Sequence, residues 1–377
     1  MKSFLQFLLR AFKYFRSTKR VWRRPPRADL LIIDRGTASP LDEMFAHHNP
    51  HIMDIRGESV NMLALLRALP KIHLGAVAYL EAYIDFVAPK LILSRTDNNH
   101  TLWQLKRRPN VTYKVALIQN GWRLNLEFEM PMLLLSDGPY APWFVDRVFS
   151  YGPTWSAQIS RTTQAHGVAV GSLFANEYLK QKKQIGVSLV STFRSEYVHK
   201  KLDLGLSLYR SLNRYLTRKN LSLTIIGFSG KENTEEEFRF MKIQLPTADW
   251  SLRTREHRLS SYESLETCGV VLVDQSSLGY EMLGLGKRVG FVASMEWSRS
   301  THRFGKPLEF GEKGPFWTND PSEEEIGRIL DYLLNVSDEQ WERDSGWIRD
   351  QLMVHDYGNT KIRAYVEGVL TDSLESK

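Results

Sequence analysis

The residues best suited to chemistry lie where an apolar run gives way to polar side chains, between Val270 and Glu281. Ser276 or Ser277 would cap the helix that follows, which brings free backbone N–H groups, two hydroxyls and the positive end of a helix dipole to one point. Such a point suits a phosphate. Glu281 lies one helical turn beyond Ser277, so its carboxylate can face the same crevice and accept hydrogen bonds from sugar hydroxyls, such as those of a ribose. An ordinary capped helix with a surface glutamate fits the same spacing equally well.

Two further polar stretches follow apolar runs in the second half of the chain. Ser191, Thr192 and Arg194 come directly after the run 186–190, where hydroxyls and a guanidinium could clamp a diphosphate. A capped helix start with a solvated arginine is the alternative. Gly227 opens a Gly-Phe-Ser-Gly-Lys stretch in which the backbone could approach a ligand closely, unless the stretch is only a glycine-rich turn.

Two loops in the first half offer carboxylate, amide and guanidinium groups. Asp97 follows a strong apolar run, and in a cleft its carboxylate could act as general base on an acceptor hydroxyl, or as a nucleophile. Asp and Asn are also common turn formers and helix caps. The amides and the cation beside Asp97 and in the neighbouring loop suit sugar hydroxyls or a carboxylate. We expect five of these residues to bind the acceptor or the sugar: Asn98, Asn99, Gln119, Asn120 and Arg123.

Metal chemistry has little support in the residue pattern. His47, His48 and His51 are candidate metal ligands. However, Pro50 interrupts the segment, and the sequence suggests no fourth ligand nearby. The single cysteine, Cys268, allows neither a disulfide framework nor a cysteine-based zinc site, which fits a reducing compartment. The absence of an Asp-x-Asp pair weakens a metal-dependent sugar-transfer mechanism. We therefore predict no metal.

The elements that must position these residues follow an alternating pattern. From residue 28 onward, short apolar runs alternate with helical patterns, which predicts an α/β fold of parallel sheets with helices on both faces. Ligands of such sheets bind outside the carboxyl ends of the strands, and seven runs end in polar, glycine-rich segments. The predicted strands are 29–33, 51–55, 90–93, 113–118, 132–135, 147–149, 168–170, 186–190, 222–226, 269–273 and 288–292. The predicted helices are 59–69, 73–86, 154–164, 197–217, 235–244, 260–266, 277–285 and 322–334.

Length and composition fit two soluble domains. The chain has 377 residues, of which 42% are hydrophobic and 25% are charged. The polar stretch 176–184 is the predicted linker. We predict two Rossmann-like domains that face a central cleft, an acceptor-side domain over 28–175 and a nucleotide-binding domain over 185–345.

Residues 1–27 are a basic arm. They hold nine of the 50 Lys and Arg residues and no acidic residue, which leaves 41 basic against 43 acidic residues in the body. The formal charge of +7 therefore comes from the arm. Large apolar residues recur in it at intervals of three and four, which predicts an amphipathic helix that lies on an anionic membrane surface. A helix packed on the protein's own body and a nucleic-acid-binding arm are the alternatives. The apolar stripe is Phe4, Leu5, Leu8, Leu9, Phe12 and Phe15.

This arm is neither a signal peptide nor a membrane span by its pattern. Arg10 and Lys13 interrupt the apolar core that a signal peptide needs, and the segment is too short and too charged to cross a bilayer.

The segment Asp274-Gln-Ser-Ser-Leu-Gly-Tyr-Glu281-Met-Leu-Gly-Leu-Gly-Lys287 resembles the C-terminal nucleotide-binding element of GT-B glycosyltransferases. It is most similar to that element in bacterial surface-carbohydrate and capsule (or O-antigen) biosynthesis transferases. Four other stretches also resemble this group, so that the similarity spans about residues 20 to 350. They are 22–34, 97–99, 119–121 and 314–318.

The resemblance implies a GT-B fold and a set of roles. Glu281 would hold the ribose of a nucleotide donor, while Ser276 and Ser277 would hold its phosphates. A C-terminal helix at about 348–369, within a segment 346–377, would pack back toward the first domain. We expect the remaining donor-side residues, Ser191, Thr192, Arg194 and Gly227, to complete the nucleotide site.

These features together predict a metal-independent glycosyltransferase that needs no cofactor. It would move a sugar from a nucleotide-activated donor, CMP-linked donors included, to a lipid-linked or surface-glycan acceptor at the cytoplasmic face of the membrane. Helix N-termini and Arg194 would stabilise the leaving phosphate. A CDP-polyol phosphotransferase of the teichoic-acid type, a nucleotide-sugar 2-epimerase and a non-catalytic membrane-bound assembly subunit remain open. No nucleic-acid partner is expected.

Overall fold

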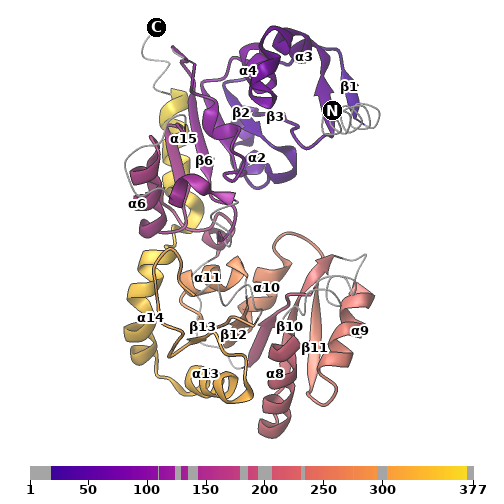
Figure 1. The fold of residues 1–377 in the computed structure, drawn as a ribbon, viewed down its shortest axis with the longest axis vertical. Helices are drawn as coiled ribbons and strands as arrows, with labels where there is room; N and C mark the ends of the chain where they lie inside the picture. The colour runs from indigo at the N-terminus through magenta and orange to yellow at the C-terminus, as the bar shows by residue number, and fades with distance from the viewer. Residues whose placement is uncertain are drawn as a thin grey trace.

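Continuous apolar runs form the centres of two parallel sheets, one in each half of the chain (Figure 1). The structure is a computed structural model. It describes residues 18–108, 110–123, 129–134, 143–178, 186–193, 206–230, 234–274, 276–294 and 304–371.

The first sheet has six parallel strands in the order β3-β2-β5-β6-β7-β8. Its central strands β2 (Leu30–Ile33) and β5 (Leu91–Ser94) are buried along their whole length, as expected where helices cover both faces. The other strands are β3 (His51–Met53), β6 (Lys114–Ile118), β7 (Arg147–Ser150) and β8 (His166–Ala169). A separate two-stranded parallel pair joins β1 (Lys19–Val21) to β4 (Ser59–Asn61).

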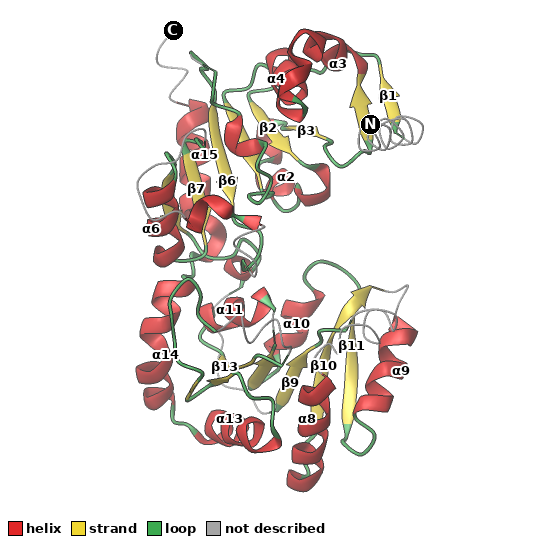
Figure 2. Cartoon of the chain, in the orientation of Figure 1, coloured by secondary structure: helices red, strands yellow, loops and turns green. Residues whose placement is uncertain are grey.

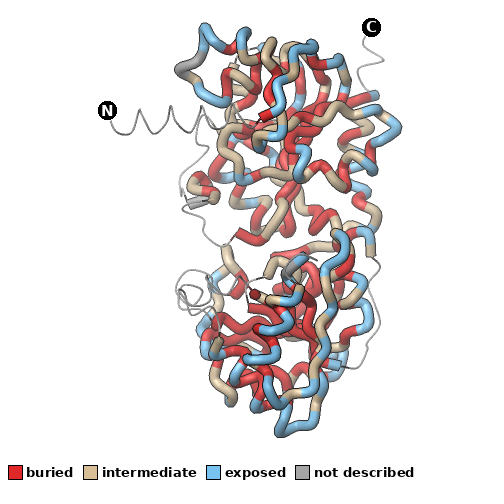
Figure 3. The backbone as a smooth tube through the Cα atoms, turned by 90° about the vertical axis from the view of Figure 1, so that its right-hand side faces the viewer, coloured by how far each residue is buried: buried red, intermediate tan, exposed pale blue. Residues whose placement is uncertain are grey.

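The second sheet has seven strands in the order β11-β10-β9-β12-β13-β15-β14, all parallel except the β14–β15 pair. Its centre is formed by β9 (Val187–Val190), β12 (Val270–Val273) and β13 (Arg288–Val292), which are buried throughout. The remaining strands are β10 (Leu223–Gly230), β11 (Trp250–Arg255), β14 (Lys313–Gly314) and β15 (Trp317–Thr318). Figure 3 shows the buried backbone concentrated in the middle of each domain.

Helices flank both sheets (Figure 2). Those in the first half are α2 (Leu41–Met44), α3 (Met62–Ala68), α4 (Ala76–Val87) and α6 (Pro153–Thr162). Those in the second half are α8 (Leu206–Lys219), α9 (Thr234–Gln244), α10 (Ser260–Glu266), α11 (Ser277–Gly284), α13 (Glu323–Asn335), α14 (Asp338–Leu352) and α15 (Thr360–Thr371). Short 3₁₀ turns include η2 (Ala46–His48), η4 (Leu102–Gln104), η5 (Pro131–Leu134), η6 (Ala175–Glu177) and η8 (Tyr357–Asn359). In the part of the chain that the structure describes, no helix is long and apolar enough to cross a bilayer.

The predicted α/β fold is confirmed, with local corrections. The predicted strand 132–135 is wrong, because Pro131 to Leu134 form η5 instead. The predicted helix 59–69 begins as strand β4 and becomes helical only at Met62, where Asn61 caps α3. Strand β11 was not predicted, since it is a half-buried edge strand whose residues alternate between partly buried and exposed. The amphipathic helix predicted within 1–27 falls on residues 1–17, which lie outside the described residues, and Lys19 to Val21 form a strand.

The end of the chain returns to the first domain, as Figure 1 shows for α15 beside β6. The single helix predicted over 348–369 is divided, because α14 ends at Leu352 and α15 begins at Thr360. Three buried residues of α15 join the core of the first sheet: Ile362, Val366 and Leu370. Helix α15 therefore completes a domain whose other elements lie between Lys19 and Glu177.

The end of α14 and the segment that leads from it to α15 lie close to the backbone of the first domain. A Cβ added to Gly152 would lie 2.4 Å from the carbonyl oxygen of Gln351, and one on Gly171 would lie 2.1 Å from that of Val354. Gly171 also has φ +78°, a conformation that favours glycine. Asn176, expected to begin a linker, is fully buried, and its side-chain amide donates to Val170 O at 2.8 Å and to Asn359 Oδ1 at 2.9 Å.

Candidate functional site

A cavity of about 240 Å³ lies between the two domains, where strands of both sheets end. Side chains that follow the strands of the first sheet line one wall, and side chains that follow β9 to β12 line the other, so the expected pair of facing edges is present. The first domain contributes Arg95, Gln119, Asn120, Tyr151, Ser172, Leu173 and Phe174. The second contributes Val190, Ser191, Ile226, Gly227, Phe228, Arg255, Arg258, Ser261, Tyr262, Ser276, Ser277, Leu278 and Glu281.

The start of helix α11 faces this cavity. Ser276 is the N-cap, and its Oγ accepts the N–H of Leu278 at 3.2 Å, which confirms the predicted cap. Gly279 lets the helix pack against β12, because a Cβ there would lie 2.5 Å from Val273. The N-terminus therefore presents its first N–H groups and the hydroxyls of Ser276 and Ser277 to the cavity, an arrangement that attracts anions.

Glu281 is the carboxylate of the cavity wall. It is only 6% exposed, and its Oε2 accepts hydrogen bonds from Ser172 Oγ at 3.0 Å and from the Tyr262 hydroxyl. Burial raises the pKa of Glu281 to about 7, while the Ser172 hydrogen bond and the nearby Arg95 guanidinium act in the opposite direction. Because Ser172 belongs to the first domain and Glu281 to the second, this hydrogen bond also joins the two domains.

Three arginines give the cavity an excess of positive charge. The Arg95 guanidinium lies 4.5 Å from the centroid of the Phe174 ring and donates to the Ser39 carbonyl, while its buried Nε has no hydrogen-bond partner among the described residues. Arg258 pairs with Glu43 of the first domain at 2.8 Å. Arg255, at the end of β11, makes no ion pair with any residue that the structure describes. Of the carboxylates that the structure describes, Glu281 alone lines the cavity, so the site favours an anionic ligand.

Sequence reasoning missed these arginines and the hydroxyls of Ser172 and Tyr262. Arg95 follows the predicted strand 90–93 directly, so the rule about carboxyl ends of strands could have selected it. Arg255 ends β11 and Arg258 follows it, and this edge strand has an alternating pattern that the sequence analysis did not recognise as a strand.

Asp97 lies off the cavity wall. It is 2% exposed, forms an ion pair with Arg123 and accepts the Asn120 N–H at 3.3 Å. Burial raises the pKa of Asp97, and the Arg123 charge opposes that shift. Arg123, itself buried, is held by Asp97 and by Asn120 Oδ1 at 3.0 Å, and it does not line the ligand cavity. Of the loop predicted to bind sugar or acceptor, Gln119 and Asn120 reach the cavity.

Of the other residues predicted to bind the donor, some line the cavity and some do not. Ser191 lines the cavity, but its hydroxyl donates to Glu237 at 2.5 Å. Thr192 does not line the cavity, and its backbone N–H donates to Tyr209 at 3.3 Å. Gly227 lines it, whereas Arg194 lies outside the described residues.

A second, mostly apolar cavity of about 320 Å³ lies within the first domain, lined by residues of β4, α3 and α4. Asn99 and Thr101 form part of its wall, while Asn98 is exposed. The loop after β5 therefore borders both cavities, with Arg95 in the first and Asn99 in the second.

Comparisons with known proteins identify a matching family and proteins of similar fold. A family model described as "putative O-antigen biosynthesis protein" matches residues 116–369. No curated protein matches the chain. Among solved structures, UDP-GlcNAc 2-epimerase from Neisseria meningitidis bound to UDP-GlcNAc aligns with a TM-score of 0.50 and 12% identity over 91% of this chain and 99% of that one.

Two other solved structures are similar to the same extent. MurG from Acinetobacter baumannii gives a TM-score of 0.51 and 10% identity over 91% of this chain and 99% of that one. The wall teichoic acid polymerase TagF gives a TM-score of 0.52 and 9% identity over 93% and 91%. At such identities the likeness shows the fold, which is the two-domain GT-B fold expected from the sequence.

Proposed function

Since the chain belongs to the family of O-antigen biosynthesis proteins, we propose that it is a glycosyltransferase that moves a sugar from a nucleotide-activated donor to a lipid-linked or surface-glycan acceptor. The observation that carries the proposal is the interdomain cavity, where cationic side chains and the N-terminus of α11 surround one buried carboxylate. A nucleoside phosphate joined to a sugar has the matching chemistry, with an anionic centre and hydroxyls on either side.

The donor phosphates lie between Arg95 and the start of α11 in this proposal. On the first-domain side, Arg95 has a buried Nε without a hydrogen-bond partner among the described residues, and Ser276 and Ser277 offer hydroxyls and N–H groups on the other side. When the acceptor hydroxyl attacks the anomeric carbon, the bond from that carbon to the phosphate oxygen breaks, and the hydroxyl proton passes to solvent water. The negative charge that develops on the leaving phosphate is stabilised by these groups, which takes the place of a metal ion.

Glu281 binds the ribose hydroxyls in this proposal. Its carboxylate already accepts two hydroxyl hydrogen bonds, from Ser172 and Tyr262, and ribose hydroxyls offer the same kind of donor. We assign Asp97 a positioning role in place of the base or nucleophile expected from the sequence. Its carboxylate holds Arg123 and the backbone of Asn120, and so shapes the cavity wall without touching the ligand.

A surface of the first domain supports attachment to a membrane. Trp22, Leu66 and Leu69 are 62%, 51% and 49% exposed, and the guanidinium groups of Arg24 and Arg67 flank the Phe86 ring at 5.2 Å each. Exposed apolar side chains with cations beside them suit an anionic lipid surface. We propose that this surface and residues 1–27 hold the protein at the cytoplasmic face of the membrane. The apolar cavity beside α3 would then receive the apolar part of a lipid-linked acceptor.

A transfer assay tests the proposed activity. The full chain is incubated with UDP-, GDP-, dTDP- and CMP-linked sugars, a CDP-linked polyol and a lipid extract, and both the lipid fraction and the released nucleotide are measured by mass spectrometry. We expect one sugar to enter the lipid fraction, Glu281→Ala to abolish the transfer, and Glu324→Ala, at an exposed glutamate, to leave it unchanged.

Other outcomes would replace the proposal with a stated alternative. Transfer of a polyol phosphate with release of CMP indicates a phosphotransferase, and conversion of a nucleotide sugar without acceptor indicates an epimerase. No reaction with any donor, together with full retention of function in cells by Glu281→Ala, indicates a non-catalytic assembly subunit.

A further inference from the structure

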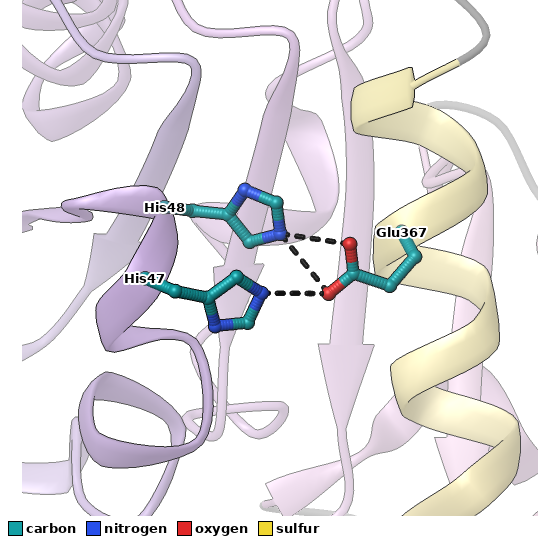
Figure 4. A group of neighbouring side chains, drawn as sticks. All are labelled: His47, His48 and Glu367. Carbon is teal, nitrogen blue, oxygen red and sulfur yellow. Dashed lines mark hydrogen bonds and ion pairs between the residues drawn. The ribbon is translucent and has the colours of Figure 1, made fainter.

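Two histidines and a glutamate from opposite ends of the chain meet on the first domain (Figure 4). His47 and His48 occupy the 3₁₀ turn η2, and Glu367 lies on α15, about 320 residues later. The Nε2 atom of each ring lies 3.0 Å from a carboxylate oxygen of Glu367. Figure 4 shows both rings presenting the same ring nitrogen to the one carboxylate, so three potential ligands converge on a single point.

The spacing of these atoms fits a metal ion. One ligand atom from each residue can be chosen so that all of them lie within 4.8 Å of one another. Around a tetrahedral zinc ion with bonds of about 2.0–2.1 Å, neighbouring ligand atoms are about 3.3 Å apart. The 3.0 Å distances from each histidine Nε2 to the Glu367 oxygens are within a few tenths of an ångström of this spacing. A cation can therefore replace the shared hydrogen bonds when the side chains adjust, with water as a further ligand. Two imidazoles and one carboxylate suit zinc, cobalt, nickel or copper, whereas magnesium and calcium prefer oxygen ligands.

The backbone holds the ligands in place before any ion arrives. Residues Ile362, Val366 and Leu370 fix α15 in the core of the first sheet, and Arg363 Nη1 donates at 3.3 Å to the carbonyl of Met44, the last residue of α2 before η2. The two rings lie with centroids 4.1 Å apart. The side chains of His47 and Glu367 are 60% and 42% exposed, so an ion can enter from solvent.

We propose that His47, His48 and Glu367 form a divalent transition-metal site, and that the bound ion clips the C-terminal helix to the first domain. The site is separate from the interdomain cavity and does not depend on the proposed transfer activity. An ion that binds only the folded chain stabilises it by mass action. Metal binding at this point therefore strengthens the closure of a domain whose last helix comes from the end of the chain.

The test is a zinc titration of the full, untagged chain after removal of metals with a chelator. We expect one zinc ion to bind per chain by calorimetry, cobalt to give a visible d–d absorption, and magnesium to have no effect. Glu367→Gln keeps an oxygen that can accept from the histidines but lacks the charge, so its melting temperature without metal should change little. We expect this variant and the double variant His47→Gln/His48→Gln to bind zinc more than about 100-fold more weakly.

His166→Gln provides the control, because His166 is an exposed imidazole on β8 outside the cluster, and it should bind zinc as the unmodified chain does. Zinc should also raise the melting temperature of the unmodified chain and not that of the double variant. The proposal is overturned if the unmodified chain shows no saturable zinc binding. It is equally overturned if the double variant, folded by circular dichroism, binds zinc with unchanged affinity, since zinc would then bind elsewhere.

Discussion

At the scale of single residues, the most informative side chain is Glu281. A surface glutamate has a pKa near 4.3, but burial between two domains raises the pKa of this carboxyl to about 7. Its Oε2 accepts hydrogen bonds from two hydroxyls, those of Ser172 and Tyr262, which is the kind of donor that a ribose would provide in the proposed site. The protonated acid loses one of these acceptor positions.

This pKa predicts a pH-dependent affinity for nucleotide. As the pH falls through about 7, Glu281 takes up a proton, and the affinity of the unmodified chain should fall, by at most about tenfold per pH unit. Phosphate groups also titrate near pH 6. Glu281→Gln separates the two effects, because it should bind more weakly at pH 8 and retain only the slope due to phosphate. Calorimetry between pH 5.5 and 8.5 measures both, and identical slopes for the two proteins would refute the assignment.

At the scale of elements, the sequence predicted most of the strands because fully buried parallel strands are continuous apolar runs. It also predicted the cap of α11, because Ser276 precedes a helical pattern. Two features that the sequence did not predict depend on contacts distant in the chain. Strand β11 forms by pairing with β10. Lys287, in the segment that resembles glycosyltransferases, donates to three carbonyls at and just after the end of α10, those of Leu265, Glu266 and Cys268.

The close contact between Gly171 and the segment that leads from α14 to α15 predicts that a side chain at this glycine will destabilise the protein. Gly171→Ala would place a Cβ 2.1 Å from the Val354 carbonyl oxygen, in a residue whose φ is +78°. We expect a loss of about 2–4 kcal/mol in the free energy of unfolding, measured by denaturant titration. Gly286→Ala is the control for backbone conformation alone, because its φ is +81° and, apart from its chain neighbours, no described residue has an atom within 4 Å of the added Cβ. It should cost about 1–2 kcal/mol, and an equal loss in both variants would contradict the close approach.

At the scale of the whole molecule, the two domains are joined by aromatic, polar and helical contacts. Trp122 of the first domain stacks on Tyr280 of the second with ring centroids 3.5 Å apart, and α14 packs against both α6 and α11. These contacts join residues that lie far apart in the chain. The same is true of the position of Arg95 in the cavity and of the contact of His47 and His48 with Glu367. Periodicity is a local signal, so it predicts the strands and helices but not which distant side chains will meet.

The path of the chain predicts how the first domain behaves when isolated. A fragment of residues 18–178 lacks α15 and leaves bare the face of the sheet that Ile362, Val366 and Leu370 cover. We expect this fragment to aggregate or to bind hydrophobic dyes, since a large apolar surface is exposed. The same fragment with residues 356–371 attached through a flexible linker should unfold cooperatively on heating. A fragment that is equally stable without the helix would show that α15 contributes little to the domain.

The most direct test of the account is nucleotide binding at the interdomain cavity. Calorimetric titrations with UDP, GDP, dTDP, CMP and CDP would be made on the unmodified chain and on Arg95→Gln, Glu281→Ala and the exposed-site control Glu324→Ala. We expect one base to bind selectively, with an affinity that falls at least about tenfold in the first two variants and is unchanged in the control. No binding of any nucleotide, or binding that both cavity variants retain in full, would contradict it.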